Sequence, residues 1–140
     1  MAHIRYRVLP LGESISIRRG DTFTLDVSGL SNLTTRTNIW FTVKNDKEDA
    51  DTSAAIQIDE DNGLLYINSA APTAAANGSI TVTDAANGNL TVALEAVESA
   101  KLSLSGRFSY DVQVLYASGD VVTETRGDAD IIGDVTRATS

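Results

Sequence analysis

The chain has 140 residues, of which 42% are hydrophobic and 21% are charged, and it contains no cysteine. A chain of this length buries roughly two-thirds of its unfolded surface around one core, so a single domain without a metal or disulfide crosslink is expected. The lack of cysteine excludes disulfides, thiolate metal sites and thiol nucleophiles. No apolar run approaches the ~18 residues of a membrane span, and the first residues lack the apolar stretch of a secretory signal, so we expect no export by that route.

The charge of the chain is acidic overall and unevenly distributed. The formal net charge is -8, which disfavours the phosphates of nucleic acids and anionic lipid surfaces, so we expect neither as a partner. Residues 1–20 carry four arginines and one glutamate, a local charge of +3 that leaves -11 for residues 21–140. We interpret residues 1–20 either as solvated strand positions or as a basic N-terminal docking arm or strand that binds an acidic neighbour.

Alternation of apolar and polar residues predicts half-buried β-strands along the whole chain. The predicted strands lie near residues 4–8, 15–17, 23–27, 39–43, 56–58, 65–67, 80–82, 90–94, 108–116, 121–126 and 129–135. Valine, isoleucine, threonine and aromatic residues, which favour strands, fill most inward positions. In the strand over 65–67, Leu65 and Ile67 are expected to share one face.

Turn signals and one helical segment separate these strands. The Asn-Gly dipeptides at 62–63, 77–78 and 87–88 tolerate the positive φ angles of tight hairpin turns, so residues 79–94 predict a hairpin. Residues 118–120 close a second hairpin, between 107–116 and 121–126. Residues 94–102 break the period of two and predict a short helical crossover between sheets, with a Glu98–Lys101 pair. Segments 45–54 and 69–78 are expected to be surface loops.

Together these elements predict an all-β fold. We expect residues 1–140 to form a single antiparallel β-sandwich domain of two sheets, with hairpin and Greek-key connections and one short helical crossover.

Few residues could carry catalysis. A serine triad or a histidine metal site needs a well-held histidine, and the single histidine, His3, lies next to the N-terminus. Asp59, Glu60 and Asp61 resemble the start of a calcium loop, but the twelfth position, which should be a bidentate acid, is Ala70, so a solvated turn is predicted. We expect no enzyme activity, no catalytic or metal-binding residues and no cofactor.

Trp40 is the most informative aromatic residue. It is out of phase with Ile39, Phe41 and Val43, so it faces away from their side of the predicted strand. Either the second sheet or a loop covers Trp40, or it is exposed as an anchor for a protein partner or as a platform for sugar rings.

Several segments resemble the small immunoglobulin-like virion proteins of tailed bacteriophages, a group that includes head or tail accessory proteins and the N-terminal domain of upper baseplate proteins. The segments are Gly106-Arg107-Phe108-Ser109-Tyr110-Asp111-Val112-Gln113-Val114, Ser118-Gly119-Asp120, Gly127, Ile131-Ile132-Gly133-Asp134-Val135-Thr136-Arg137, Arg19-Gly20-Asp21-Thr22-Phe23 and Trp40-Phe41-Thr42-Val43-Lys44. The Arg-containing N-terminal arm and the Ala-rich segment 69–78 depart from that group and favour a small independent subunit.

The resemblance implies an immunoglobulin-like sandwich and a non-enzymatic virion structural protein. The first expectation is a capsid decoration or cement protein that stabilises the shell; a tail or baseplate adaptor is the alternative, and a carbohydrate-binding module is a more remote one. The implied partners are the major capsid protein or tail and baseplate proteins, with other copies of the chain as a homo-oligomer, in a virion assembled in the host bacterial cytoplasm. Arg5, Arg7, Trp40 and Arg137 are the interface candidates.

Overall fold

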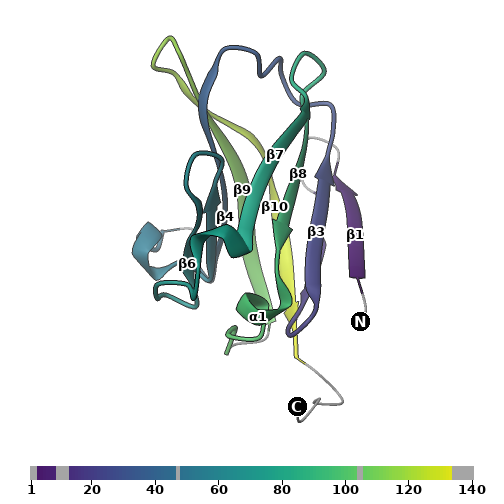
Figure 1. Ribbon diagram of the computed structural model, residues 1–140, viewed down its shortest axis with the longest axis vertical. Helices are drawn as coiled ribbons and strands as arrows, with labels where there is room; N and C mark the ends of the chain where they lie inside the picture. Colours follow the sequence, from purple (N-terminus) through teal and green to yellow (C-terminus); the bar gives the residue numbers. More distant parts are fainter. Residues whose placement is uncertain (1–2, 9–12, 47, 104–105, 134–140) are drawn as a thin grey trace.

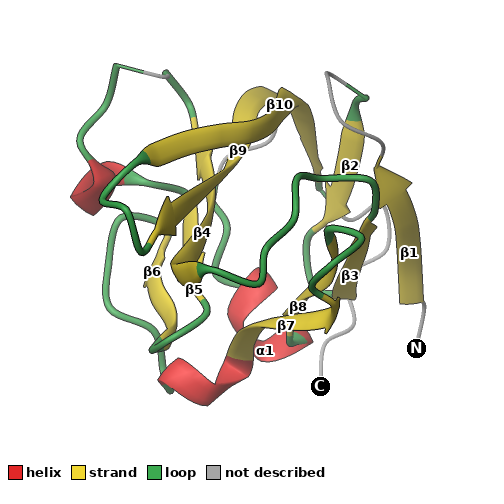
Figure 2. Cartoon of the chain, turned by 90° about the horizontal axis from the view of Figure 1, so that it is seen from above, coloured by secondary structure: helices red, strands yellow, loops and turns green. Residues whose placement is uncertain are grey.

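Two β-sheets pack face to face in the computed structural model, which describes residues 3–8, 13–46, 48–103 and 106–133, the first of these ranges by its backbone. Figure 1 shows the strands running along the long axis of the molecule, and Figure 2 shows the two layers seen from above. Within these ranges no helix is long and apolar enough to span a membrane.

The smaller sheet has four strands in the order β1-β3-β8-β7, and the larger has six in the order β2-β10-β9-β4-β5-β6. The strands of the smaller sheet are β1 (His3–Val8), β3 (Thr22–Val27), β8 (Asn89–Leu94) and β7 (Gly78–Asp84). Those of the larger sheet are β2 (Ile15–Arg18), β10 (Val121–Ile132), β9 (Gly106–Tyr116), β4 (Arg36–Lys44), β5 (Ile56–Asp59) and β6 (Gly63–Ile67). The predicted all-β, two-sheet fold is confirmed.

The strand order is that of an immunoglobulin domain of the variable type. In such domains strands B, E and D form one sheet, and strands G, F, C, C′ and C″ form the other; β3-β8-β7 and β10-β9-β4-β5-β6 reproduce these two orders. Most neighbouring strands are antiparallel, as predicted. Two pairs at the edges are parallel instead, β1 with β3 and β2 with β10, because the chain crosses from one sheet to the other after each of these N-terminal strands.

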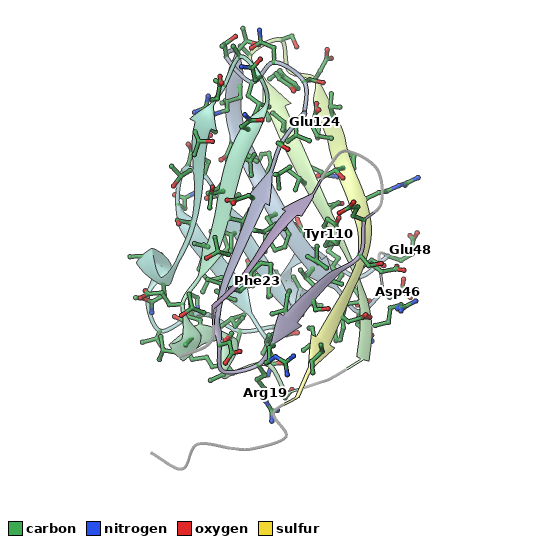
Figure 3. All side chains as sticks on the ribbon, turned by 90° about the vertical axis from the view of Figure 1, so that its right-hand side faces the viewer. Arg19, Phe23, Asp46, Glu48, Tyr110 and Glu124 are labelled. Carbon is green, nitrogen blue, oxygen red and sulfur yellow. The ribbon has the colours of Figure 1, made fainter. Side chains whose placement is uncertain are left out.

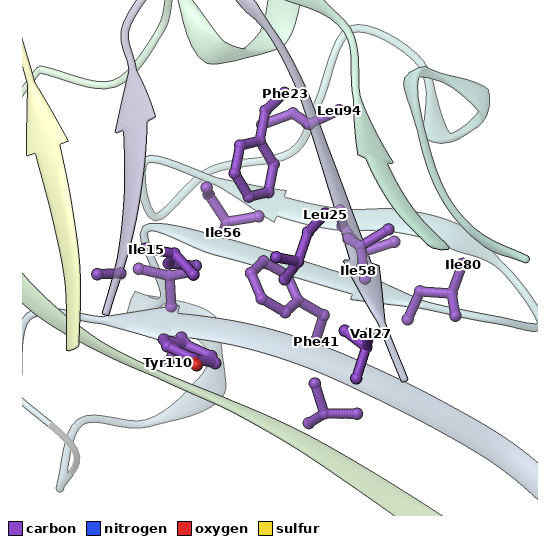
Figure 4. Packing of buried hydrophobic residues seen from close by; sticks show 14 of the residues in the cluster. Ile15, Phe23, Leu25, Val27, Phe41, Ile56, Ile58, Ile80, Leu94 and Tyr110 are labelled. Carbon is purple, nitrogen blue, oxygen red and sulfur yellow. The ribbon is translucent and has the colours of Figure 1, made fainter. Parts of the chain in front are cut away.

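The core lies between the inward faces of the two sheets and has an aromatic centre (Figure 4). Phe41 on β4 is fully buried, and the centre of its ring lies 6.3 Å from that of Phe23 on β3 and 6.1 Å from that of Tyr110 on β9. In antibody domains a tryptophan on strand C packs there against a disulfide between strands B and F. This chain has no cysteine, and three aromatic rings from the same three strands fill the space.

A single helical turn, α1 (Ala96–Ser99), connects β8 in the smaller sheet to β9 in the larger one, as the broken periodicity predicted. The predicted Glu98–Lys101 ion pair is present, with 2.9 Å between the Lys101 Nζ and the Glu98 Oε1. The Glu98 side chain is fully buried and also accepts hydrogen bonds from the backbone N–H groups of Thr73 and Ala74 and from the Asn77 side chain. It therefore fixes the Ala-rich loop to the crossover.

The two predicted loops each contain a short 3-10 helix, η1 (Asp51–Ser53) and η2 (Ala75–Asn77). The second one corrects a predicted turn. Asn77-Gly78 is not a hairpin turn, because Gly78 has an extended backbone with φ of -135° and begins β7 directly after η2. The hairpins after Asn62 and Asn87 are confirmed: Gly63 and Gly88 have positive φ angles, and β5-β6 and β7-β8 pair antiparallel.

Two strands differ from those that the periodic pattern predicts. A register shift between Gln57 and Ile58 lets Ile58 pair with Leu64, so Leu64 and Ile67 face the core and the predicted inward residue Leu65 does not. The segments predicted as separate strands at 121–126 and 129–135 form one strand, β10, up to Ile132. The predicted break falls at Gly127-Asp128, but both residues pair with β9 in unbroken register, opposite Tyr110 and Ser109. Positions 134–135 of the second predicted strand lie outside the described residues.

Gly88 is required by both its backbone angle and its surroundings. Its φ is +70°, and a Cβ atom added there would lie 2.2 Å from the carbonyl oxygen of Leu30, a fixed backbone atom. We expect Gly88→Ala to lower the free energy of unfolding by more than about 2 kcal/mol, measured by denaturant titration. Gly119→Ala is the matched control, because its φ is +94° but nothing lies within 4 Å of its added Cβ. It should cost only about 1 kcal/mol, and equal losses at the two positions would contradict this view of the Leu30 contact.

Candidate functional site

The outer face of the larger sheet carries Trp40 and several polar side chains. Alternation along β4 buries Ile39, Phe41 and Val43 and places Trp40 and Thr42 on the opposite face. Trp40 is half-buried there. In register with Trp40 and Thr42 lie Gln113 and Asp111 on β9, so polar groups from a distant part of the chain surround the tryptophan. We call this surface the polar face.

Two adjoining depressions form a groove on the polar face, which we call the polar groove. One, of about 410 Å³, is lined by residues of β4, β9 and β10, among them Arg126; the other, of about 420 Å³, is lined by residues of β4, β5 and β9 together with Trp40 and Val121. Thr42, Lys44 and Asp111 line both depressions. The groove is therefore continuous between Trp40 and Arg126.

Lys44 and two carboxylates set the electrostatics of the polar groove. The Lys44 Nζ lies 2.8 Å from the Asp51 Oδ1, and this hydrogen bond is the main reason that the pKa of Asp51 is lowered. Burial raises the pKa of Asp111, although the positive charges of Lys44 and Arg126 oppose this effect. The negative charge of Asp111 is therefore less stabilised by its surroundings than that of Asp51.

Side-chain amides add hydrogen-bonding groups beside the carboxylates. The Gln57 Nε2 donates to the Thr42 Oγ1 at 3.2 Å, and the Gln113 Nε2 donates to the Thr123 Oγ1 at the same distance. These bonds link neighbouring strands on the polar face and hold the two amide groups in place. The groove is thus lined by oriented polar side chains together with one large aromatic ring.

The acidic turn after β5 is built differently from the solvated turn that was predicted. Asp59 is only 3% exposed. Its carboxylate accepts hydrogen bonds from the backbone and side chain of Asn62 and from the Asn38 side chain, while Glu60 forms a bidentate pair with Arg36. The acids of this turn stabilise the β5-β6 hairpin. Across the described part of the chain, no group of three or more histidine, cysteine or acidic side chains could hold a metal ion.

The N-terminal arginines are divided between different surroundings. Arg5 and Arg7 belong to β1, the edge strand of the smaller sheet. Arg19 lies in the turn before β3 and donates to the Leu102 carbonyl at 3.2 Å, at the opposite end of the sandwich from Glu124 (Figure 3). The Arg18 Nε lies 3.9 Å from the Asp21 Oδ2. The basic segment 1–20 therefore contributes β1 to the smaller sheet and β2 to the larger sheet.

The four predicted interface residues do not form one surface. Arg5 and Arg7 lie on the edge of the smaller sheet, Trp40 lies on the outer face of the larger sheet, and Arg137 is outside the described residues. Sequence reasoning did not predict that Asp111 and Arg126 line the same polar groove as Trp40. The signal available was the polar phase of residues 109–113, but nothing local shows that β9 pairs with β4.

Comparisons with known proteins identify no family for this chain. No family model matches the chain, and no curated protein matches it. Among solved structures, the chain is similar to the NK cell receptor NKp44, described as a triggering partner in natural cytotoxicity, with 11% sequence identity and a TM-score of 0.49. The similarity covers 86% of this chain and 99% of the receptor chain. The strand order places the chain among all-β proteins with an immunoglobulin-like, two-sheet sandwich.

Proposed function

We propose that this protein is a non-enzymatic structural subunit of a bacteriophage particle, namely a capsid decoration or cement protein that stabilises the shell through protein contacts. The resemblance of residues 106–114, 118–120 and 131–137 and of segments 19–23 and 40–44 to small virion proteins supports a place in the particle. The net charge of -8 disfavours nucleic acid and membranes as partners. The protein would act in the virion, after assembly in the host bacterial cytoplasm.

The observation that carries the docking part of this proposal is the position of β1. Among the described strands β1 pairs only with β3, and its other side is an edge of the smaller sheet. An edge strand presents backbone N–H and C=O groups to which a partner strand can add. Arg5 and Arg7 lie on this strand, so an acidic segment of the major capsid protein, or of another copy of the chain, is the partner that its charge suits.

The docking part is tested by reversing the charge of β1. The double variant Arg5→Glu/Arg7→Glu should bind particles lacking the protein at least about tenfold more weakly, and its binding should depend less on salt concentration. Binding is measured by co-sedimentation with purified particles. The matched control is Arg107→Glu/Arg126→Glu, which changes the net charge equally but lies on the polar face. Equal weakening by both variants, or by neither, would contradict docking through β1.

A further inference from the structure

β1 is attached to the sandwich through one strand pair and one chain connection. It runs parallel to β3, whereas β2, the next strand along the chain, runs parallel to β10. Figure 1 shows β10 pointing the opposite way to β1 and β3, so the chain reverses its direction between β1 and β2. β1 is therefore a strand added to the outer edge of β3, and its removal would break no other strand pair in the described part of the chain.

The edge of β3 that β1 covers cannot stay empty in a stable sandwich. Apolar residues of β1 stand in register with buried apolar residues of β3: Ile4 with Phe23, Tyr6 with Leu25 and Val8 with Val27. An empty edge would leave backbone N–H and C=O groups of β3 without partners and uncover this side of the core. Each sandwich therefore needs a β1 strand, but the register does not require that the strand come from the same copy.

The connection between β1 and β2 is short for the path that it has to take. It comprises residues 9–14, which lead from the smaller sheet to the larger one and across the reversal of direction. Packed sheets lie about 10 Å apart. Short connections that must turn the chain favour the exchange of a terminal element between copies, because the same residues can lead into a neighbouring copy without that turn.

The charges of the chain suit such an exchange. Two copies with a net charge of -8 each repel one another, yet residues 1–20 carry +3 and residues 21–140 carry -11. Exchange places the basic segment of each copy against the acidic remainder of the other, which reduces the repulsion between them. Within the strand pair, Arg7 stands in register with Asp26. The acceptor edge thus matches β1 in charge as well as in its apolar pattern.

We propose that two copies of the chain exchange β1 reciprocally, so that β1 of each copy pairs with β3 of the other in the same register and the two copies form a symmetric dimer. Exchange preserves every strand pair of the single sandwich, since the same contacts form between copies instead of within one. Docking through β1 uses the outer side of this strand, which remains an edge in the exchanged dimer. The exchange is a property of the free protein and does not depend on a place in a phage particle.

Disulfide crosslinking tests the exchange without changing any arginine. The chain has no cysteine, and His3 on β1 is in register with Thr22 on β3. Neighbouring strands lie about 4.8 Å apart, within the Cα distance that a disulfide spans. Copies with His3→Cys alone are unfolded together with copies with Thr22→Cys alone, refolded at about 100 µM and oxidised. We expect a heterodimer with its disulfide between positions 3 and 22, identified by mass spectrometry.

The matched control replaces Thr22→Cys by Ser79→Cys, an exposed position on β7 at the opposite edge of the smaller sheet, and should give almost no heterodimer. In analytical ultracentrifugation the wild type should have twice the chain mass of 14.8 kDa. Insertion of Gly-Ser-Gly-Ser after Gly12 should shift it toward the monomer. A double variant His3→Cys/Thr22→Cys that forms only disulfides within one chain would overturn the proposal. A dimer without the crosslink between positions 3 and 22 would also overturn it, in favour of another surface.

Discussion

Replacing Phe41 by alanine is expected to lower the free energy of unfolding by about 3–5 kcal/mol. The Phe41 side chain is fully buried. The centre of its ring lies 6.3 Å from that of Phe23 and 6.1 Å from that of Tyr110. Its removal leaves a cavity between the two sheets that backbone hydrogen bonding prevents from closing. The measurement is denaturant unfolding followed by far-UV circular dichroism.

The control for Phe41→Ala is Val121→Ala, an apolar truncation at a side chain that is 60% exposed. It should change the free energy of unfolding by less than about 0.5 kcal/mol. Tyr110→Phe separates the ring from the hydroxyl, which donates a hydrogen bond of 2.6 Å to the Glu13 carbonyl. It should cost about 1 kcal/mol. A loss below about 1 kcal/mol in Phe41→Ala would show that the three rings do not hold the sheets together.

Glu98→Gln is expected to lower the free energy of unfolding at neutral pH by about 3 kcal/mol. Burial by itself would raise the pKa of Glu98, but hydrogen bonds from Lys101, Asn77 and the backbone of Ala74 and Thr73 outweigh it and lower the pKa to about 2. The amide of glutamine cannot accept all of these bonds. The Ala-rich loop would then lose its attachment to α1.

The same carboxylate predicts a pH dependence of stability. The unfolded chain takes up a proton near pH 4.5 and the folded chain near pH 2, so this contribution is fully present above pH 4.5 and is lost as the pH falls toward 2. The difference in free energy of unfolding between wild type and Glu98→Gln should therefore shrink over that interval. Glu95→Gln, an exposed change next to α1, should show no such trend. A difference that stays constant from pH 7 to pH 3 would contradict the role given to the charge.

Most of the fold could be predicted from the sequence, because strands, hairpins and the crossover follow from local patterns. Alternation finds the inward residues of β3, β4, β8 and β9, and the turns after Asn62 and Asn87 follow from Asn-Gly chemistry. The pattern fails where pairing is irregular. Leu64 replaces Leu65 in the core because of a register shift against β5, and only the partner strand determines such a shift.

The candidate site was less predictable than the fold. The alternation along β4 indicates that Trp40 faces away from the core, and the structure places it on the polar face. Asp111 and Arg126, which line the same polar groove, come from strands about 70 to 85 positions further along the chain. Composition and periodicity do not specify this pairing. The separation of Arg5 and Arg7 from Trp40 likewise follows from the assignment of β1 and β4 to different sheets.

The most direct test of the proposed structural role is the copy number of this protein in purified phage particles. Quantitative mass spectrometry against the major capsid protein gives the ratio of the two chains. A decoration or cement subunit predicts a ratio near one or a simple fraction of it. A few copies per particle would assign the protein to the tail or baseplate instead, and its absence from the particles would contradict a virion role altogether.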